Sequence, residues 1–451
     1  MAYYTTREPS DGPVRFMLLV ALALFTTGAV SGQSPVYATL YSFKGGADGL
    51  SPHAGVVLGE NGGLYGTTYE GGTGTLGTAF LLVPSTGGSW DKAVLHNFSG
   101  PDGSLPAASL VFSKTGSLYG TTLEGGTGNN GGTVFELTPP SVAGGAWTET
   151  VLYSLAGGCG GQRIPYGAVA VSSTGVLYGT ASWDACLPPG IATGGAVFGL
   201  TPPAASGGDW TEHTLLNLDK NPVGTYPLGG VVSAGGPLYG TAYYSGGLYG
   251  QACGSVYEVS PPDPPGGDWS GTAILTFSGA PNDGCGSQAA LTVGPGGVLY
   301  GTTTYGGSGA CSSDGGYFMG CGVVFELTPP SASGGAWTET VIYSFTGVNG
   351  DGAYPAASVL LDKSGILYGT TTSGGQVTPA CTSGCGTVFQ LTPPTIPGGI
   401  WTETVLHGFT GQNGDGSIPM AGLTETSSGV LYGTASAGGT AGKGTVFSVT
   451  P

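Results

Sequence analysis

The stretch "YATLYSF", Tyr37–Phe43, stands in front of a chain whose remaining sequence repeats one unit. The same strand recurs as "TVLYSL" from Thr150 and "TVIYSF" from Thr340, and each of these later copies finishes a unit. Their β-branched and aromatic residues favour a β-strand. The copy at Tyr37 comes before any unit has begun, so its position bears on how the repeats are joined.

The motif "LYGT" marks the repeat and begins at Leu64, Leu118, Leu177, Leu238, Leu299, Leu367 and Leu431. Each copy is followed by a Gly-rich loop and a "GTVF"-like strand, which begins at Gly77, Gly132, Gly195, Gly254, Gly322, Gly386 and Gly444. A Pro-containing turn and a tryptophan follow six of these strands, at Trp90, Trp147, Trp210, Trp269, Trp337 and Trp401. Short connections rich in Gly, Pro and Asn are typical of antiparallel meanders. Each unit therefore predicts four strands: A before "LYGT", B containing it, C containing "GTVF", and D like "TVLYSL".

Strands A, B and C occur seven times, but D occurs only six times after them, because the chain stops at Pro451 after the last strand C. Tyr37–Phe43 supplies the seventh strand D. We therefore predict an all-β fold, a seven-bladed β-propeller with four-stranded antiparallel blades, whose last blade is closed by the N-terminal strand. A β-solenoid is the alternative, although solenoid coils are usually shorter and need no ring closure.

The repeated "LYGTT", "GTVFxLTP" and "GGxWTETVLYSF" resemble the GloVer tandem-repeat family of secreted bacterial proteins. The resemblance covers nearly all of residues 36–451. It implies a bacterial, exported protein with a propeller-like fold. It implies no established activity and no catalytic residues.

Residues 1–32 are predicted to be a secretory signal peptide, and residues 33–451 the propeller. Arg7 and Arg15 precede a short apolar run, Phe16–Phe25, and small residues follow this run up to Gly32. A membrane span needs about 20 apolar residues, so an uncleaved anchor is the less favoured alternative. The expected location is outside the cytoplasm: secreted, periplasmic or at the cell surface.

Composition excludes several classes of protein. Of 451 residues 92 are Gly and 8% are charged, yet 39% are hydrophobic, which a disordered linker would lack. The net charge of −17 argues against nucleic acid and anionic membranes as partners. We predict a monomer without a cofactor and without a membrane span in the mature chain.

The meander places the B–C and D–A loops on one face of the ring and the A–B and C–D loops on the other. The C–D loops are uniform, as in "TPPSVAGGAW" and "TPPSASGGAW", whereas the B–C and D–A loops differ from repeat to repeat. Binding residues are most often carried by variable loops on a fixed scaffold. This variable face is therefore the predicted functional face.

All eight cysteines fall in the variable loops, which indicates an oxidising compartment. A consistent pairing is Cys159–Cys186, Cys253–Cys285, Cys311–Cys321 and Cys381–Cys385. Exchange among Cys253, Cys285, Cys311 and Cys321 stays open, and a metal site of Cys ligands is a less favoured alternative because the short ligand spacing is mostly missing.

Aromatic residues also gather in the variable loops, and they include Tyr69, Tyr249 and Phe318. Aromatic rings stack on the C–H faces of sugars, and carboxylates and amides accept bonds from the hydroxyls. The predicted ligand-binding residues are Arg163, Trp183, Asp184, Tyr243, Tyr244, Tyr305 and Tyr317. Two alternatives are that these rings only pack the loops together, or that they bind a protein.

Five D–A loops contain an Asp-Gly pair, at Asp48, Asp102, Asp283, Asp351 and Asp415. Five carboxylates near one rim raise the alternative of Ca²⁺ binding, but one Asp per loop is too few for such a site. We predict instead that each Asp bonds the backbone of its own turn.

Signatures of catalysis are weak. The "GTGTLG" and "GTGNNG" loops at Gly72 and Gly126 lack the helix that a dinucleotide site needs. Glu70 and Glu124 follow "LYGTT" in adjacent units, and paired carboxylates can hydrolyse a glycosidic bond. A duplicated turn explains them more simply. The predicted function is thus a non-enzymatic glycan- or protein-binding module; the alternatives are a carbohydrate-active enzyme or a structural surface component.

Overall fold

The structure is a computed structural model that describes residues 34–451 except 129, 143, 157–161, 185–193, 206, 219–222, 234–235, 246–251, 264–265, 313–317, 333 and 397. For residues 162–163 and 183–184 only the backbone is described. The proposed signal peptide lies outside the described residues, as do Cys159, Cys186, Tyr249 and Tyr317. Pro35–Pro451 form one compact unit.

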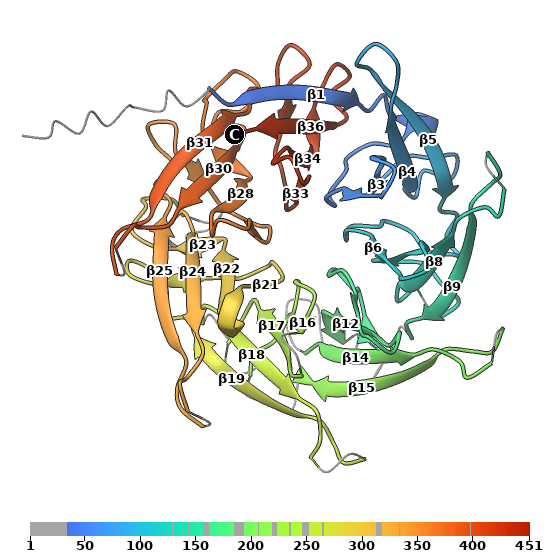
Figure 1. Cartoon of the computed structure of the whole chain (residues 1–451), viewed down its shortest axis with the longest axis horizontal. Helices are drawn as coiled ribbons and strands as arrows, with labels where there is room; N and C mark the ends of the chain where they lie inside the picture. Colours follow the sequence, from blue (N-terminus) through green and yellow to red (C-terminus); the bar gives the residue numbers. More distant parts are fainter. Residues whose placement is uncertain are drawn as a thin grey trace, which may run out of the picture. The chain divides into compact units, whose positions relative to one another are not determined.

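Across the described residues the strands form seven four-stranded antiparallel sheets, which are the blades of a propeller with strand A innermost and strand D outermost (Figure 1). Blade 1 contains β2 (Val57–Leu58), β3 (Leu64–Thr68), β4 (Thr78–Pro84) and β5 (Trp90–Asn97); blade 2 contains β6 (Val111–Phe112), β7 (Leu118–Thr122), β8 (Thr133–Thr138) and β9 (Thr148–Ser154). Blade 3 contains β11 (Ala170–Val171), β12 (Leu177–Ala181), β14 (Ala196–Thr201) and β15 (Thr211–Asn217); blade 4 contains β16 (Val232–Ser233), β17 (Leu238–Ala242), β18 (Ser255–Ser260) and β19 (Ser270–Thr276). Blade 5 contains β21 (Thr292–Val293), β22 (Leu299–Thr303), β24 (Val323–Thr328) and β25 (Thr338–Ser344); blade 6 contains β27 (Leu360–Leu361), β28 (Leu367–Thr371), β30 (Thr387–Thr392) and β31 (Thr402–Gly408). Blade 7 contains β33 (Thr424–Glu425), β34 (Leu431–Ala435), β36 (Thr445–Thr450) and the N-terminal β1 (Val36–Ser42).

The N-terminal strand closes the ring, as predicted. β1 pairs antiparallel with β36, and the register shifts between Thr39 and Tyr41, opposite Phe447 and Val446. Other C–D pairs shift at the same place, such as between Val134 and Phe135 in blade 2. β1 therefore reproduces the β-bulge of a chain-continuous blade, although it comes from the other end of the chain.

Strand A is shorter than predicted. In blade 2 the small-residue run before "LYGT" begins at Ala107, but the ladder of strand A with strand B includes only Val111 and Phe112. The physical reason is crowding at the axis. A Cβ on Gly167 would lie 2.3 Å from the backbone nitrogen of Gly230 in the next blade, so these segments pack backbone against backbone.

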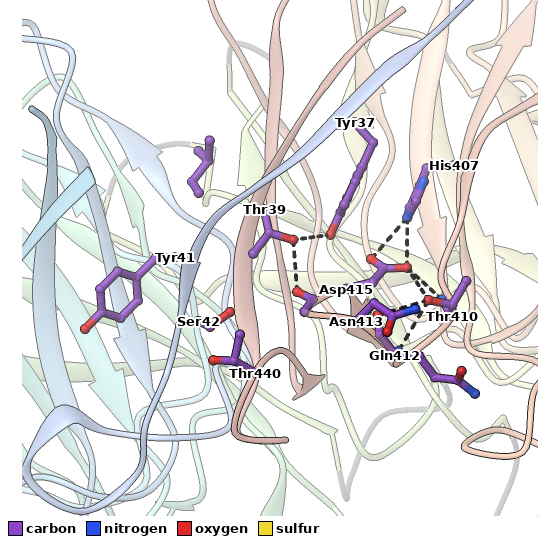
Figure 2. Close-up of a pocket in the computed structure, with 12 residues that line it drawn as sticks. Tyr37, Thr39, Tyr41, Ser42, His407, Thr410, Gln412, Asn413, Asp415 and Thr440 are labelled. Carbon is purple, nitrogen blue, oxygen red and sulfur yellow. Dashed lines mark hydrogen bonds and ion pairs between the residues drawn. The ribbon is translucent and has the colours of Figure 1, made fainter. Parts of the chain in front are cut away.

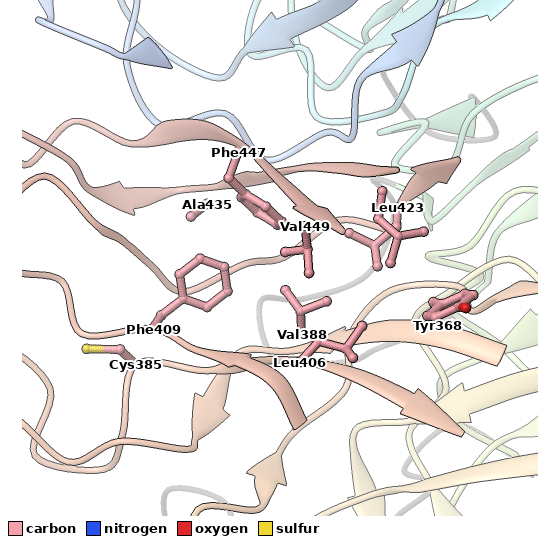
Figure 3. Packing of buried hydrophobic residues seen from close by; sticks show 10 residues of the cluster. Tyr368, Cys385, Val388, Leu406, Phe409, Leu423, Ala435, Phe447 and Val449 are labelled. Atoms are coloured by element: carbon pink, nitrogen blue, oxygen red, sulfur yellow. The ribbon is translucent and has the colours of Figure 1, made fainter. Parts of the chain in front are cut away.

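The hydrophobic core lies between adjacent blades. Figure 3 shows one such cluster, in which Val388 and Phe409 of blade 6 pack against Phe447 and Val449 of blade 7. The glycine of "LYGT" is required here, because a Cβ on Gly120 would lie 2.4 Å from the Phe135 ring that covers it. Full burial of one such ring contributes about 1.5–3 kcal/mol.

The threonine of "LYGT" fastens each blade to the next. At all seven junctions its buried hydroxyl donates to a carbonyl of the next blade's inner segment: Thr67 to Pro106, Thr121 to Gly167, Thr180 to Gly229, Thr241 to Ala289, Thr302 to Ala357, Thr370 to Ala421 and Thr434 to Ala54. The bond from Thr434 joins blade 7 to blade 1, so the closing junction has the same fastener as the others.

The remaining elements belong to the loops. Among the described residues these are two short 3-10 helices and four two-stranded ladders. They are η1 (Gly46–Asp48), η3 (Pro295–Gly297), β10 (Gln162–Arg163) with β13 (Trp183–Asp184), β20 (Gly284–Cys285) with β23 (Tyr305–Gly306), β26 (Gly352–Ala353) with β29 (Ser373–Gly374), and β32 (Gly416–Ser417) with β35 (Ala437–Gly438).

Candidate functional site

The variable loops are held together by backbone pairing that the sequence did not reveal. In blades 3, 5, 6 and 7 a short ladder ties each D–A loop to the B–C loop of the blade that follows it. In blades 1, 2 and 4 single bridges do the same, at Leu50–Glu70, Ser104–Glu124 and Thr225–Tyr244. The described parts of the variable loops are therefore joined to one another by backbone pairing at all seven blades.

At one equivalent position in every D–A loop the residue has a left-handed backbone, with φ between 56° and 70°: Ser51, Leu105, Ile164, Tyr226, Gly286, Tyr354 and Ile418. Such φ values are uncommon outside glycine, and least favourable for β-branched Ile164 and Ile418. Each of these residues donates its N–H to the previous blade and accepts a bond from its own B–C loop; Tyr226, for example, bonds Gly194 and Tyr243. These two bonds hold the next part of the loop in a fixed position.

Two residues further on, each loop reaches the axis and lines a pocket of about 450 Å³. The equivalent side chains, one from every blade, are His53, Ala107, Tyr166, Leu228, Gln288, Ala356 and Met420, and the pocket wall is completed by Tyr226, Tyr243 and Tyr244 of blade 4. Because all seven blades contribute, this central pocket lies on the axis at the variable face.

An aromatic cluster extends from the pocket across blades 4, 5 and 6. It contains Tyr226, Tyr243, Tyr244, Tyr305, Phe318 and Tyr354. The rings of Tyr243 and Tyr244 are 4.7 Å apart, and those of Tyr305 and Phe318 stack at 5.3 Å. All six side chains are partly exposed. Burial, with lesser contributions from neighbouring tyrosines, raises the pKa of the Tyr243 phenol, which stays uncharged at physiological pH.

Three of the four predicted disulfides are present: Cys253–Cys285, Cys311–Cys321 and Cys381–Cys385. This settles the exchange left open among Cys253, Cys285, Cys311 and Cys321. Cys285 pairs through its backbone with Tyr305, and a Cβ on the adjoining Gly286 would meet the Tyr243 ring at 3.1 Å. The first disulfide therefore braces the loops that carry the aromatic cluster. The predicted Cys159–Cys186 bond lies outside the described residues.

The other predicted ligand-binding residues have different outcomes. Tyr243, Tyr244 and Tyr305 lie together in the aromatic cluster. Arg163 pairs through its backbone with Trp183, and Gln162 with Asp184, so the third-blade group does meet at one ladder. Its role remains a prediction, and Tyr317 lies outside the described residues.

The sequence did not point to several residues of the pocket and of the aromatic cluster. Tyr226 of the pocket and Tyr354 of the cluster lie in D–A loops, whereas the predicted aromatic residues lie mostly in B–C loops. His53, Tyr166 and Gln288 stand alone in sequence and only the ring brings them together. The signal that could have found these three is position: each lies two residues after the left-handed residue of its D–A loop and directly before a small residue.

The Asp-Gly carboxylates cap their own turns, as predicted. Asp102 accepts bonds from the backbone N–H of Ser99 at 2.8 Å and from its hydroxyl at 3.0 Å. Asp415 and Asp351 bond Thr410 and Thr346 in the same way.

At three junctions the same Asp also faces a glutamate from strand D of the next blade. These pairs are Asp102–Glu149, Asp283–Glu339 and Asp351–Glu403, and in each the glutamate keeps one buried oxygen without a hydrogen-bond partner among the described atoms. Burial first, and then the facing aspartate, raise the pKa of Glu149 and Glu403 to about 7 and that of Glu339 to about 8. His96 joins the first pair, with ligand-type atoms within 4.8 Å of one another, a spacing common in acidic groups that bind no metal.

Glu70 and Glu124, the candidate catalytic pair, are both exposed on the variable face. Neither side chain has the buried, apolar surroundings that are usual for a general acid. The charge of Glu124 does reach the pocket rim: burial first, and then Glu124, raise the pKa of Tyr166.

Two further hollows belong to blade packing. One, of about 560 Å³, runs beside β1, where the polar side chains of Tyr37, His407 and Asp415 already bond or stack with one another (Figure 2). Another, of about 550 Å³, lies on the uniform face between Tyr65 and Trp147. All six repeat tryptophans make this contact with the "LYGT" tyrosine of the preceding blade, so the contact is part of the scaffold.

Seven four-stranded blades, the last of them closed by β1, define an all-β seven-bladed propeller. The model of the Gloeobacter/Verrucomicrobia repeat matches residues 25–186, 141–375 and 309–451, and the chain belongs to this family. None of the curated proteins matches the chain in sequence. No helix among the described residues is long and apolar enough to cross a membrane.

Two solved structures are similar in fold. The extracellular domain of the hybrid two component system BT4673 from B. thetaiotaomicron has a TM-score of 0.53 at 11% identity, over 92% of this chain. This chain spans 42% of that domain's length. A mutant of AofleA from Arthrobotrys oligospora has 11% identity over 84% of this chain and 91% of its own, with a TM-score of 0.39 that is too low for comparing sites. At this identity the first likeness shows the fold alone.

Proposed function

We propose that this propeller is an exported, non-enzymatic module that binds glycans through the aromatic cluster of its variable face. The observation that carries the proposal is the cluster itself: six partly exposed rings from three blades in continuous contact, beside a pocket. Flat rings present C–H-binding faces, and their phenol groups both donate and accept hydrogen bonds. Three disulfides are typical of an oxidising compartment, where extracellular glycans are found.

The proposal includes the removal of residues 1–32 and a monomeric mature chain. Rigid loops favour binding, because a ligand then orders few side chains on association. The backbone ladders and the Cys253–Cys285 bond supply that rigidity. The third-blade group of Arg163, Trp183 and Asp184 is proposed as an extension of the same surface.

The test is a glycan array probed with the mature protein and with Tyr305→Ala, Tyr305→Phe and Trp183→Ala variants. We expect Tyr305→Ala to lose most binding and Tyr305→Phe to keep much of it, since stacking needs only the ring. Val377→Ala is the matched control, because this side chain is 71% exposed in a blade 6 loop outside the cluster. Absence of binding to any glycan, or binding indifferent to the Tyr305 ring, would count against the proposal.

A further inference from the structure

The central pocket differs from the aromatic cluster in what it can admit. The cluster is an open surface, whereas the pocket has side chains from all seven blades around it. A ligand that enters along the axis is therefore surrounded by side chains from all seven blades. A volume of about 450 Å³ has room for roughly one or two sugar rings.

The pocket also has a distinct charge. Of the ten residues that line it, none is Asp, Glu, Lys or Arg, although the chain as a whole carries −17. Burial lowers the pKa of His53, which stacks on Tyr69 at 4.2 Å, so its imidazole is neutral at physiological pH. The hydrogen-bonding groups are thus four phenols, one imidazole and the Gln288 amide, all uncharged.

Neutral groups that both donate and accept match the hydroxyls of a sugar. The Gln288 amide is already oriented, because its nitrogen donates to the Thr304 hydroxyl at 2.7 Å. Among the ten described residues that line the pocket, an anion would find no cationic partner. It would also meet the carboxylate of Glu124, whose charge acts on Tyr166 at the rim. A buried charge without a partner is strongly disfavoured.

We propose that the central pocket binds the uncharged terminal sugar of a glycan chain, inserted end-on along the propeller axis. This inference rests on the proposed function and narrows it. The aromatic cluster contacts the following sugars, and the pocket selects the chain end. The protein then recognises glycan termini and discriminates against chains that end in an acidic sugar.

The experiment uses calorimetry of the mature protein with the best neutral oligosaccharide from the array. A second ligand is the same oligosaccharide with its non-reducing terminal sugar oxidised to a uronic acid. We expect the oxidised end to weaken binding by at least about tenfold, because an unpaired carboxylate costs more than 1.4 kcal/mol. Equal affinity for the two ends would overturn the inference.

Pocket-filling variants give an independent reading. Ala356→Trp should lower the affinity by at least about tenfold, whereas Ala356→Ser should stay within about twofold, since only the larger side chain occupies the pocket. Ala107→Trp repeats the test from another blade, with circular dichroism to verify folding. If both Trp variants misfold, the comparison of chain ends on the unaltered protein still decides.

The outcomes separate the two proposals. Binding that needs Tyr305 but is unchanged by a folded Ala356→Trp variant would leave glycan binding intact and overturn the pocket inference. Binding of internal chain segments as strong as binding of free ends would also overturn it. Loss of all glycan binding on the array would remove the proposed function itself.

Discussion

The two junctions of blade 7, with blade 6 and with blade 1, differ from the junctions that lead into blades 2, 5 and 6. The difference lies in the residue at one position of strand D. Where blades 2, 5 and 6 have Glu149, Glu339 and Glu403, each facing an Asp-Gly carboxylate, β1 has Tyr37. Strand D of blade 1, at the junction between blades 7 and 1, has Lys92 at this position. Two buried carboxyls hold together only while they share a proton. Neither described junction of blade 7 contains such a carboxyl pair at this position.

At the two junctions of blade 7 the aspartates face side chains that can bond to or pair with a carboxylate. Tyr37 stacks on His407 at 3.6 Å, and His407 lies 3.2 Å from Asp415 (Figure 2). On the other side Lys92, whose side chain is 3% exposed, pairs with Asp48 at 3.2 Å. Burial acts to raise the pKa of Asp48, but the bonds from Tyr41 and Lys44 and the charge of Lys92 outweigh it and lower the pKa. The difference teaches that blade 7, the blade built from both ends of the chain, is held against its two neighbours by contacts that need no shared proton near neutral pH.

Removal of β1, the strand that closes blade 7, should have the largest effect on stability. A chain that lacks Tyr37–Phe43 leaves the β36 edge unpaired and removes the buried Phe43 ring, which packs on Phe80 at 5.3 Å. We expect the melting temperature to fall by about 10 °C or more and the protein to self-associate through the open edge. Calorimetry and light scattering measure both. A synthetic peptide of residues 34–46 should restore the monomer, whereas a scrambled peptide should not. An unchanged melting temperature in a monomeric product would disprove closure.

Replacing Lys92 with the glutamate that blades 2, 5 and 6 have at this position should have the next largest effect on stability. Lys92→Glu replaces a buried ion pair with a carboxyl pair beside Asp48, and we expect a loss of about 3–5 kcal/mol of unfolding free energy at pH 8. The loss should shrink at pH 5, where the new glutamate takes up a proton. Lys92→Met is the control: it keeps the apolar stem and should show no such pH dependence. Equal losses for Lys92→Glu at both pH values would contradict the comparison.

The ordinary junctions should make stability depend on pH. The glutamate pKa rises on folding from 4.5 to about 7 at Glu149 and Glu403 and to about 8 at Glu339. A raised folded pKa adds stability that is complete below about pH 4.5 and is lost as the pH rises through 7 to 8. We therefore expect the melting temperature to drop by several degrees between pH 5 and pH 9. The triple Glu→Gln variant should have a flatter profile, and a slope that survives in this variant would refute the assignment.

The smallest effect should be the same at every junction. Thr180→Val and Thr434→Val each remove one buried hydroxyl bond, at an ordinary junction and at the closing one, with O···O distances of 2.9 and 2.8 Å. Each should cost about 1–2 kcal/mol in urea unfolding. If Thr434→Val cost several times more than Thr180→Val, the closing junction would have to carry an unequal share of the stability.

Repetition explains how much could be predicted from the sequence. The strand count that placed Tyr37–Phe43 in blade 7, the Asp turns and three disulfides all follow from units compared with one another, and the structure contains them. The length of strand A did not follow, because it depends on how closely glycines such as Gly167 approach the neighbouring blade.

The candidate site was harder to predict for a physical reason. Local propensity argues against a left-handed conformation at Ile164 and Ile418, yet bonds to the previous blade impose it. Tyr243, Tyr244 and Tyr305 were found because they are aromatic residues in variable loops. Ala107 and Ala356 carry no chemical signal at all, and their importance lies in the space they leave beside larger residues on other blades.

The seven positions around the axis have a consequence for evolution. Each side chain there belongs to a different repeat, stands outside the blade cores, and is presented by a backbone bend that bonds to neighbouring strands rather than to the side chain itself. A single codon change in one repeat can therefore alter one side of the pocket and leave the folding of all seven blades untouched. Selection could search new ligands one blade at a time, without the loss of stability that usually accompanies a remodelled binding site.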